Sequence, residues 1–78
     1  MTLNIISAEE ILFSGEAESV TLPGTEGDFM VLKDHASLLS TLASGTIRFT
    51  DSQGQQHTAE IPGGLADVDN NVVSVCVY

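Results

Sequence analysis

The sequence predicts a single all-β domain. Short runs rich in Val, Ile and Leu alternate with turn-forming residues about every eight to twelve positions, a pattern typical of β-sandwiches and barrels. No linker, repeat or low-complexity tract divides the 78 residues, and a chain of this length is one domain. Leu, Ile, Val and Phe make up 23 of the 78 residues, too many for a disordered acidic segment. We therefore expect residues 1–78 to form one β-sandwich or barrel.

The strands expected in the first part of the chain are Leu3–Ile6, Ile11–Ser14, Glu16–Leu22 and Phe29–Leu32. In the third run, alternation places Glu18, Val20 and Leu22 on one face and Ala17, Ser19 and Thr21 on the other, so the inward face begins near Val20. Pro23 and Gly24 end this run. The fourth run predicts a short buried strand, because four apolar residues are too few for a helix.

The strands expected in the last part are Thr46–Thr50, Gln56–Ile61, Leu65–Val68 and Val72–Tyr78. The first two form a hairpin through a polar turn at 52–55, with Ile47 and Phe49 inward and Arg48 outward. The last two are joined through Asp69-Asn70-Asn71, since Asn and Asp tolerate the positive φ of tight hairpin turns.

The segment His35–Ser44 fits two structures. Leu38, Leu39 and Leu42 have helical spacing, and Gly45 is a suitable helix C-cap. The same residues are compatible with a strand. Periodicity leaves helix and strand both open here.

The charge of the chain limits its partners. Eleven acidic residues against two basic ones give a formal charge of −9, which repels nucleic acid and anionic lipid head groups. A basic protein surface is the partner that this charge favours. A chain this small buries only about 60 to 65% of its unfolded surface and is marginally stable alone, so a permanent partner is expected.

Nothing in the composition predicts a metal, a cofactor or a membrane span. Cys76 is the single cysteine, interpreted as a small apolar strand residue, and no Cys/His spacing resembles a zinc site. The chain has no apolar run of about 18 residues and no signal-peptide pattern at its start. A cytoplasmic location is expected.

Residues with catalytic potential are few. Asp34, His35 and Ser37 are near neighbours, whereas nucleophilic triads are assembled from distant positions around an oxyanion hole. We therefore expect no catalytic site. His57 lies on the apolar face of its predicted strand and is interpreted as a packed structural histidine.

The segment around Gly24 and Gly27 predicts a docking patch. No Gly-Lys-Ser/Thr follows these glycines, so they are interpreted as turn residues with positive φ or close backbone approach rather than as a phosphate loop. Glu26 and Asp28 project from this turn beside the apolar Phe29 and Met30, the arrangement of charge around apolar area found in protein interfaces.

The only lysine, Lys33, supports an alternative function. Small acidic all-β domains carry lipoyl or biotinyl groups on one lysine at a hairpin tip. Those carriers have Asp before and Ala after the lysine, or Met on both sides. Here the neighbours are Leu32 and Asp34, which weakens the carrier hypothesis.

Four motifs in order resemble the N-terminal β domain of the epsilon subunit of F-type ATP synthase. They are S-A-E-E-x-L-F-S-G-E (7–16), G-T-E-G-D-F-M-V-L-K-D-H-A-S-L-L (24–39), G-T-I-R-F (45–49) and G-G-L-A-D-V-D-N-N-V-V-S-V (63–75). Together they cover nearly the whole chain, so the resemblance is much more specific than any single glycine pair.

The resemblance implies a flattened ten-stranded β-sandwich or barrel of two packed sheets, with Leu38–Leu42 as a strand. It also implies a non-catalytic rotor subunit without a cofactor, bound to the gamma subunit and the c-subunit ring on the cytoplasmic side of the bacterial inner membrane. By matched positions, the expected c-ring contacts are Glu26 and Asp28. The expected gamma-subunit contacts are Ser7, Phe29, Met30, His35 and Leu38.

The chain departs from the family pattern in a few places. Asp28 replaces a common glutamate, Met30 a frequent glycine and Ser37 a frequent proline, so the side chains near the turn differ from those common in the family. The family usually continues into two C-terminal helices that inhibit ATP hydrolysis. Because this sequence ends at Tyr78, inhibition by such helices is expected to be absent.

Overall fold

The computed structural model describes residues 1–78 and contains strands and turns without any helix. Its eight strands are β1 (Thr2–Ile6), β2 (Ile11–Gly24), β3 (Gly27–Leu32), β4 (Leu38–Leu42), β5 (Gly45–Asp51), β6 (Gln56–Ile61), β7 (Gly64–Asp69) and β8 (Val72–Val77). The all-β prediction is confirmed. The segment 35–44, which periodicity left open, contains strand β4, as the family resemblance implied.

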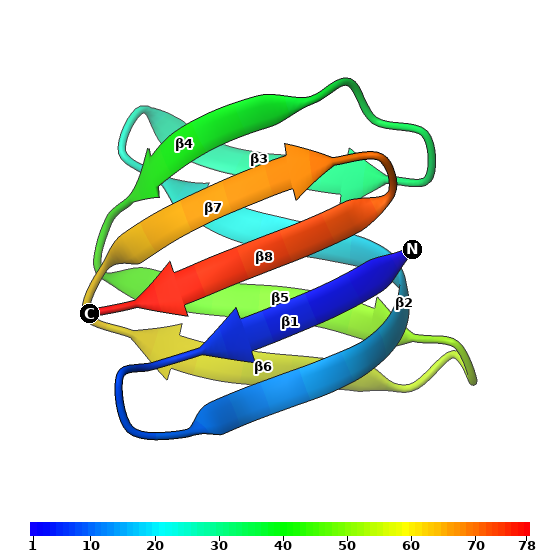
Figure 1. The fold of residues 1–78 in the computed structure, drawn as a ribbon, viewed down its shortest axis with the longest axis horizontal. Coiled ribbons are helices and arrows are strands. Elements are labelled where there is room, and N and C mark those ends of the chain that lie inside the picture. Colours follow the sequence, from blue (N-terminus) through cyan, green and yellow to red (C-terminus); the bar gives the residue numbers. More distant parts are fainter.

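The strands form two layers that share β2 (Figure 1). One layer has the order β4-β7-β8-β1 and ends with the first half of β2, which pairs with β1. The other layer has the order β3-β2-β5-β6 and uses the second half of β2. The 14-residue β2 bends from one layer into the other, so a single hydrogen-bonded sheet folds over on itself.

The resemblance-based count of ten strands in two sheets differs from this structure, which has eight strands in one continuous sheet. The separate runs expected at Ile11–Ser14 and Glu16–Leu22 are one strand. Gly15, between them, remains paired with Leu3 of β1, so the backbone ladder is not interrupted. The chain turns the corner by bending rather than by a loop.

A β-bulge in β2 changes which residues point inward. The pairing with β5 shifts between Ala17 and Ser19, so two successive residues oppose one on the partner. Ala17 is buried before the shift, and Val20 and Leu22 are buried after it. The bulge places Ala17 inward together with Val20 and leaves Glu18 exposed, so the predicted place of Ala17 on the face opposite Val20 is wrong. The inward positions of Val20 and Leu22 are confirmed.

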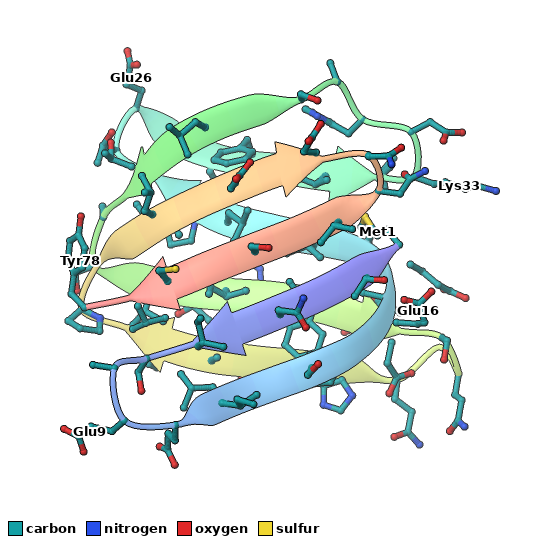
Figure 2. The ribbon with its side chains drawn as sticks, viewed as in Figure 1. Met1, Glu9, Glu16, Glu26, Lys33 and Tyr78 are labelled. Carbon is teal, nitrogen blue, oxygen red and sulfur yellow. The ribbon has the colours of Figure 1, made fainter.

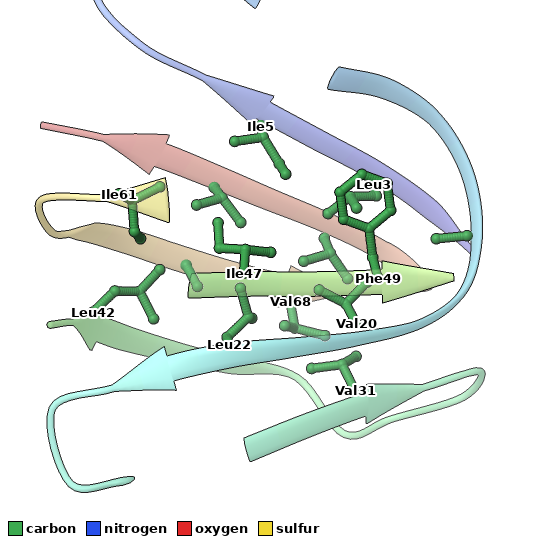
Figure 3. Close-up of a cluster of buried hydrophobic side chains, with 14 residues drawn as sticks. Leu3, Ile5, Val20, Leu22, Val31, Leu42, Ile47, Phe49, Ile61 and Val68 are labelled. Atoms are coloured by element: carbon green, nitrogen blue, oxygen red, sulfur yellow. The ribbon is translucent and has the colours of Figure 1, made fainter. Parts of the chain in front are cut away.

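Fourteen apolar residues fill the space between the layers (Figure 3). Both layers contribute, with Leu3 and Val73 on one side and Leu22 and Ile47 on the other, all fully buried. No buried side-chain nitrogen or oxygen lacks a hydrogen-bond partner. The hydrophobic effect is therefore the main stabilising force, as expected for a sandwich whose inner faces alternate with outer ones.

The C-terminal hairpins match the sequence-based expectation. Ile47 and Phe49 of β5 are buried and Arg48 is exposed. The turn between β7 and β8 has positive φ at Asn70 (51°) and Asn71 (62°), which Asn adopts with little strain.

Strand β3 differs from the prediction of a buried strand. It pairs only with β2 and is therefore an edge strand. Val31 is the one buried residue in it, whereas Met30 and Leu32 are 55% and 52% exposed. A four-residue apolar run does not distinguish an edge strand from a central one, because the missing neighbour is a property of the whole sheet.

Candidate docking surfaces

Four of the predicted contact residues line one shallow groove between β3 and β4. Glu26, Asp28, Phe29 and Leu38 meet there, together with Gly24, Thr25, Gly27 and Ser40. We call these eight residues the β3–β4 groove. The structure thus brings together acidic and apolar residues that the sequence places up to 12 positions apart.

Two glycines shape the turn at one end of this groove. Gly27 has φ of +124°, a conformation that side chains with a Cβ rarely adopt. A Cβ on Gly24 would lie 2.7 Å from the Gly27 carbonyl oxygen and 3.0 Å from the Phe29 ring. Gly27 supplies the backbone conformation and Gly24 the close approach, which confirms the interpretation of these glycines as turn residues.

The two carboxylates predicted to contact a partner are not equivalent. Asp28 Oδ2 accepts a hydrogen bond from Arg48 Nη2 at 3.2 Å in an exposed ion pair. Glu26 is at the tip of the turn and takes part in neither ion pair of the structure. Glu26 is therefore the free negative charge of the groove.

The end of the molecule that bears Glu26 is acidic. Glu26 and Glu9, which lies in the β1–β2 turn, project from the same end, and Lys33 lies at the opposite end (Figure 2). The only other basic side chain, Arg48, is already paired with Asp28. This end therefore presents unpaired carboxylates to a partner, a charge distribution that favours a basic surface.

A second surface, which the sequence-based prediction missed, lies on the outer face of the β4-β7-β8-β1 layer. Ile6 is in register with Cys76, and Cys76 is in register with Leu65. We call these three residues the apolar row. All three are exposed, Ile6 by 39% and Leu65 by 37%. Leu39, 69% exposed, lies on the same face of this layer.

A signal for this row was present in the sequence. Outward positions of an antiparallel strand facing water are normally polar, yet the alternation of the strands places Ile6, Leu65 and Cys76 outward. Recognising the row requires the register that aligns three strands far apart in the sequence. The individual strands do not contain that register.

Ser7 and His35, both predicted to contact the same partner, lie at opposite ends of the molecule. Ser7 follows β1, beside the end of β8, and His35 follows Asp34, which is hydrogen-bonded to Asn71 at the start of β8. The six residues of β8 separate the two ends by about 20 Å. A single partner touches both only if it extends along the strands.

The remaining predicted contacts face different ways. Phe29 and Leu38 are partly buried against the core in the groove. Met30 points to the outer face of the other layer, where it lines a shallow hollow with Thr21 and Arg48. Met30 is therefore not on the face that bears the apolar row.

The segment Asp34-His35-Ser37 has no triad geometry. His35 Nδ1 donates to the carbonyl of Ala36 at 2.7 Å, and Ser37 Oγ donates to Asp69 Oδ1 at 2.7 Å. Ser37 and His35 are thus each bonded to a different residue rather than to each other.

His57 is packed as predicted. Its Nε2 is 2.8 Å from Asp51 Oδ2, and its ring stacks on Phe49. Asp51 also accepts the backbone N–H groups of Gln53 and Gln55, each at 2.9 Å. The hydrogen bond from His57, followed by those from the turn backbone, lowers the pKa of Asp51 below its usual value. These hydrogen bonds to Asp51 stabilise the β5–β6 turn.

The structure contains no cluster of three or more His, Cys, Asp or Glu residues arranged to hold a metal ion. It also contains no helix with the length and apolar character needed to cross a bilayer.

Comparison with known proteins identifies the family of this sandwich. The family model of the ATP synthase Delta/Epsilon chain beta-sandwich domain matches residues 1–78. The chain belongs to this family. The ATP synthase epsilon chain of Chlorobaculum tepidum is 44% identical over 70 residues, which are 90% of this chain and 80% of that protein. The epsilon chain of Wolinella succinogenes is 44% identical over 75 residues, 96% of this chain and 57% of that one.

Solved structures of ATP synthase assemblies contain the same fold. A chain in the Euglena gracilis mitochondrial ATP synthase, solved with OSCP, F1 and the c-ring, has a TM-score of 0.89 and 26% identity, covering 96% of this chain and 48% of its own length. A chain in the central stalk and c-ring of the Tetrahymena thermophila enzyme has a TM-score of 0.80 at 15% identity, a likeness of fold alone. This chain spans about half of the Euglena one and between 57% and 80% of the two curated relatives.

Family membership replaces the carrier hypothesis for Lys33. That hypothesis required a lysine at the tip of a tight hairpin. Lys33 instead begins the five-residue connection from β3 to β4, two strands that are not paired along their length.

Proposed function

We propose that this domain is a non-catalytic subunit of the central stalk of an F-type ATP synthase. In this role it binds the gamma subunit and the c-ring and joins them mechanically, so that ion-driven rotation is coupled to ATP synthesis. The observation that carries the proposal is the family match over residues 1–78, together with the 0.89 TM-score to a chain of an assembled ATP synthase. The location that follows is peripheral, on the cytoplasmic side of the bacterial inner membrane.

The mechanical properties of the domain suit this role. Passing torque requires a stiff body with several anchored contacts rather than a reactive group. The core is fully apolar, and the layers are joined through the continuous strand β2. Because residues 1–78 form no helix, the role proposed for this stretch is coupling rather than inhibition by helices.

We assign the acidic end to the c-ring. Glu26 is exposed at the tip of a rigid turn and is free of an internal ion pair. Asp28 lies beside Glu26 and is paired with Arg48. It therefore contributes less free negative charge to the turn than Glu26 does. Basic loops of a partner would find unpaired carboxylates here without first breaking an internal contact.

We assign the gamma subunit to the outer face of the β4-β7-β8-β1 layer and the adjoining β3–β4 groove. The apolar row supplies area that gains from removal from water. Ser7 is at one end of this face and His35 near the other, so a partner that lies along the strands contacts both. Phe29 and Leu38 are reached from the same side through the groove, whereas Met30 is a contact only if the partner also wraps around the edge strand.

The proposal is tested by mixing the purified chain with its cognate gamma subunit. We expect a stable complex that buries about 1,600 Å² in total, the size of a standard specific interface. The variant Leu65→Asp places a charge in the apolar row while leaving the core intact. We expect this variant to fold as the native chain does and to bind gamma more weakly. Failure of the native chain to bind gamma under conditions where both are folded would refute the proposal.

A further inference from the structure

The two layers are open along one side, between β3 and β4. Strand β3 pairs only with β2. Strand β4 pairs with β7 along its length and with β2 at a single position, Gly24 with Leu42. Beside that position, Thr25 N–H donates to the Thr41 carbonyl at 3.2 Å, and the two threonine hydroxyls are 3.0 Å apart. Backbone pairing thus closes the opening at the Glu26 end.

The opposite end of this opening is closed by side chains. The backbone N–H of Asp34 donates to Asn71 Oδ1 at 2.7 Å, and Asn71 Nδ2 donates back to Asp34 Oδ1 at 3.0 Å. Ser37 Oγ adds a third bond to Asp69 Oδ1 at 2.7 Å. These bonds join the loop 33–37 to the β7–β8 turn, which is 37 positions away in the sequence.

Both partners of the reciprocal pair have unusual backbone conformations. Asp34 has φ of 65° and Asn71 has φ of 62°, the left-handed region that Asn and Asp visit more readily than other side chains. The two reciprocal hydrogen bonds therefore connect residues that both hold this conformation, one in each loop.

We propose that Asp34 and Asn71 form a latch that holds the loop 33–37 in one conformation. The latch positions His35, the residue that follows Asp34, for the gamma subunit. Asp34 and Asn71 are positioning residues, because they act through the loop. The ordering of the loop 33–37 by the latch is inferred from the hydrogen bonds alone. The role of the latch in gamma binding rests on the proposed function.

The chemistry of the pair permits a reciprocal test. In Asn71→Asp, the donor Nδ2 is replaced by an oxygen that faces the Asp34 carboxylate, so one bond becomes a repulsion. Adding Asp34→Asn restores a donor on the other side, because the new amide at position 34 donates to the new carboxylate at position 71. That carboxylate still accepts the backbone N–H of residue 34. Both replacements exchange Asn and Asp, which both tolerate positive φ, so neither adds backbone strain.

The first measurement needs only the isolated chain. Backbone ¹⁵N order parameters are near 0.85 for rigid residues and below about 0.6 for flexible ones. We expect Asn71→Asp to lower the order parameters of residues 33–37 toward the flexible range, and the double variant Asp34→Asn/Asn71→Asp to restore them. The matched control is Asn70→Asp, which adds the same charge to the neighbouring residue of the turn, whose side chain makes no hydrogen bond. An unchanged loop in Asn71→Asp, or no recovery in the double variant, overturns the latch.

The second measurement is the affinity for the cognate gamma subunit. Loss of one hydrogen bond that preorganises a binding loop corresponds to roughly a three- to tenfold loss of affinity. We expect this loss in Asn71→Asp, and near-native affinity in the double variant and in Asn70→Asp. A loosened loop with unchanged affinity overturns the positioning role. If the native chain itself does not bind gamma, the proposed function fails, while the order parameters still decide whether the latch exists.

Discussion

The ring of His57 stacks on the ring of Phe49, with centroids 5.0 Å apart and planes inclined by 14°. The two residues are a direct cross-strand pair of β5 and β6. Phe13, from the first half of β2, lies with its ring centroid 4.5 Å from that of Phe49. The three rings connect the β5–β6 hairpin to the strand that bends between the layers, and therefore help to hold the fold closed on the side opposite the latch.

The contact between His57 and Asp51 predicts a pH dependence of stability. Because hydrogen bonds lower the pKa of Asp51 in the folded state, its contribution to the free energy of unfolding is present above the unfolded pKa of about 3.9 and is lost as the pH falls through the lower folded pKa. We expect the stability difference between the native chain and Asp51→Asn to shrink as the pH falls below about 4. Urea titrations at a series of pH values measure it. The control Asp67→Asn changes an exposed carboxylate that makes no hydrogen bond, and a similar pH trend in that control would contradict the assignment.

The core predicts which leucines the domain requires. Leu22 is fully buried and Leu39 is 69% exposed. Leu22→Ala should lower the free energy of unfolding by about 2 to 5 kcal/mol, whereas Leu39→Ala should change it by less than about 0.5 kcal/mol. Chemical denaturation of both variants makes the comparison. Equal losses would mean that the inward face of β2 has been assigned wrongly.

The turn at the Glu26 end predicts a steric effect. A Cβ at position 24 would meet the Gly27 carbonyl oxygen and the Phe29 ring, and overpacking of this kind costs about 1 to 3 kcal/mol. We expect Gly24→Ala to lower stability by such an amount and to displace Phe29 in the groove, visible as a changed ring chemical shift. Thr25→Ala, which removes one exposed hydroxyl contact, should cost less than about 1 kcal/mol.

The acidic end predicts a charge effect on assembly. Glu26→Lys, alone or with Asp28→Lys, should weaken binding to the c-ring and make the remaining binding less sensitive to salt. The effect on folding should stay within about 1 kcal/mol for each change, because both carboxylates are exposed. Glu18→Lys is the matched control, since Glu18 lies beside Lys33 at the opposite end. An equal loss of c-ring binding in the control would refute a specific role for the Glu26 end.

The apolar row predicts protection of a thiol. Cys76 is the only cysteine and is exposed in the centre of the row. Bound gamma should slow its alkylation by iodoacetamide at least tenfold if the row is in the interface. The comparison variant Cys76→Ser/Thr58→Cys carries the thiol on exposed β6 of the other layer, where the rate should not change. Unprotected Cys76 in a formed complex would assign gamma to another face.

Local features of the sequence predicted much of the fold. Alternation identified the inward residues Ile47 and Phe49 of β5, and Asn70 and Asn71 marked a turn that has the expected positive φ. The motif at 24–39 predicted a turn from which two carboxylates project. Through the family resemblance it also predicted the strand β4. These features were accessible because each depends on residues close together in the chain.

The sequence by itself determined the all-β class, the family and the acidic turn, since turn chemistry and the two-residue period of a strand are local properties. Only the tertiary structure decided that β2 bends without a break, that a bulge leaves Glu18 outside, and that β3 is an edge strand. It alone aligned Ile6, Cys76 and Leu65, and joined Asp34 to Asn71. The physical reason is that register and strand neighbours depend on contacts between distant segments, which the packing of the whole core selects.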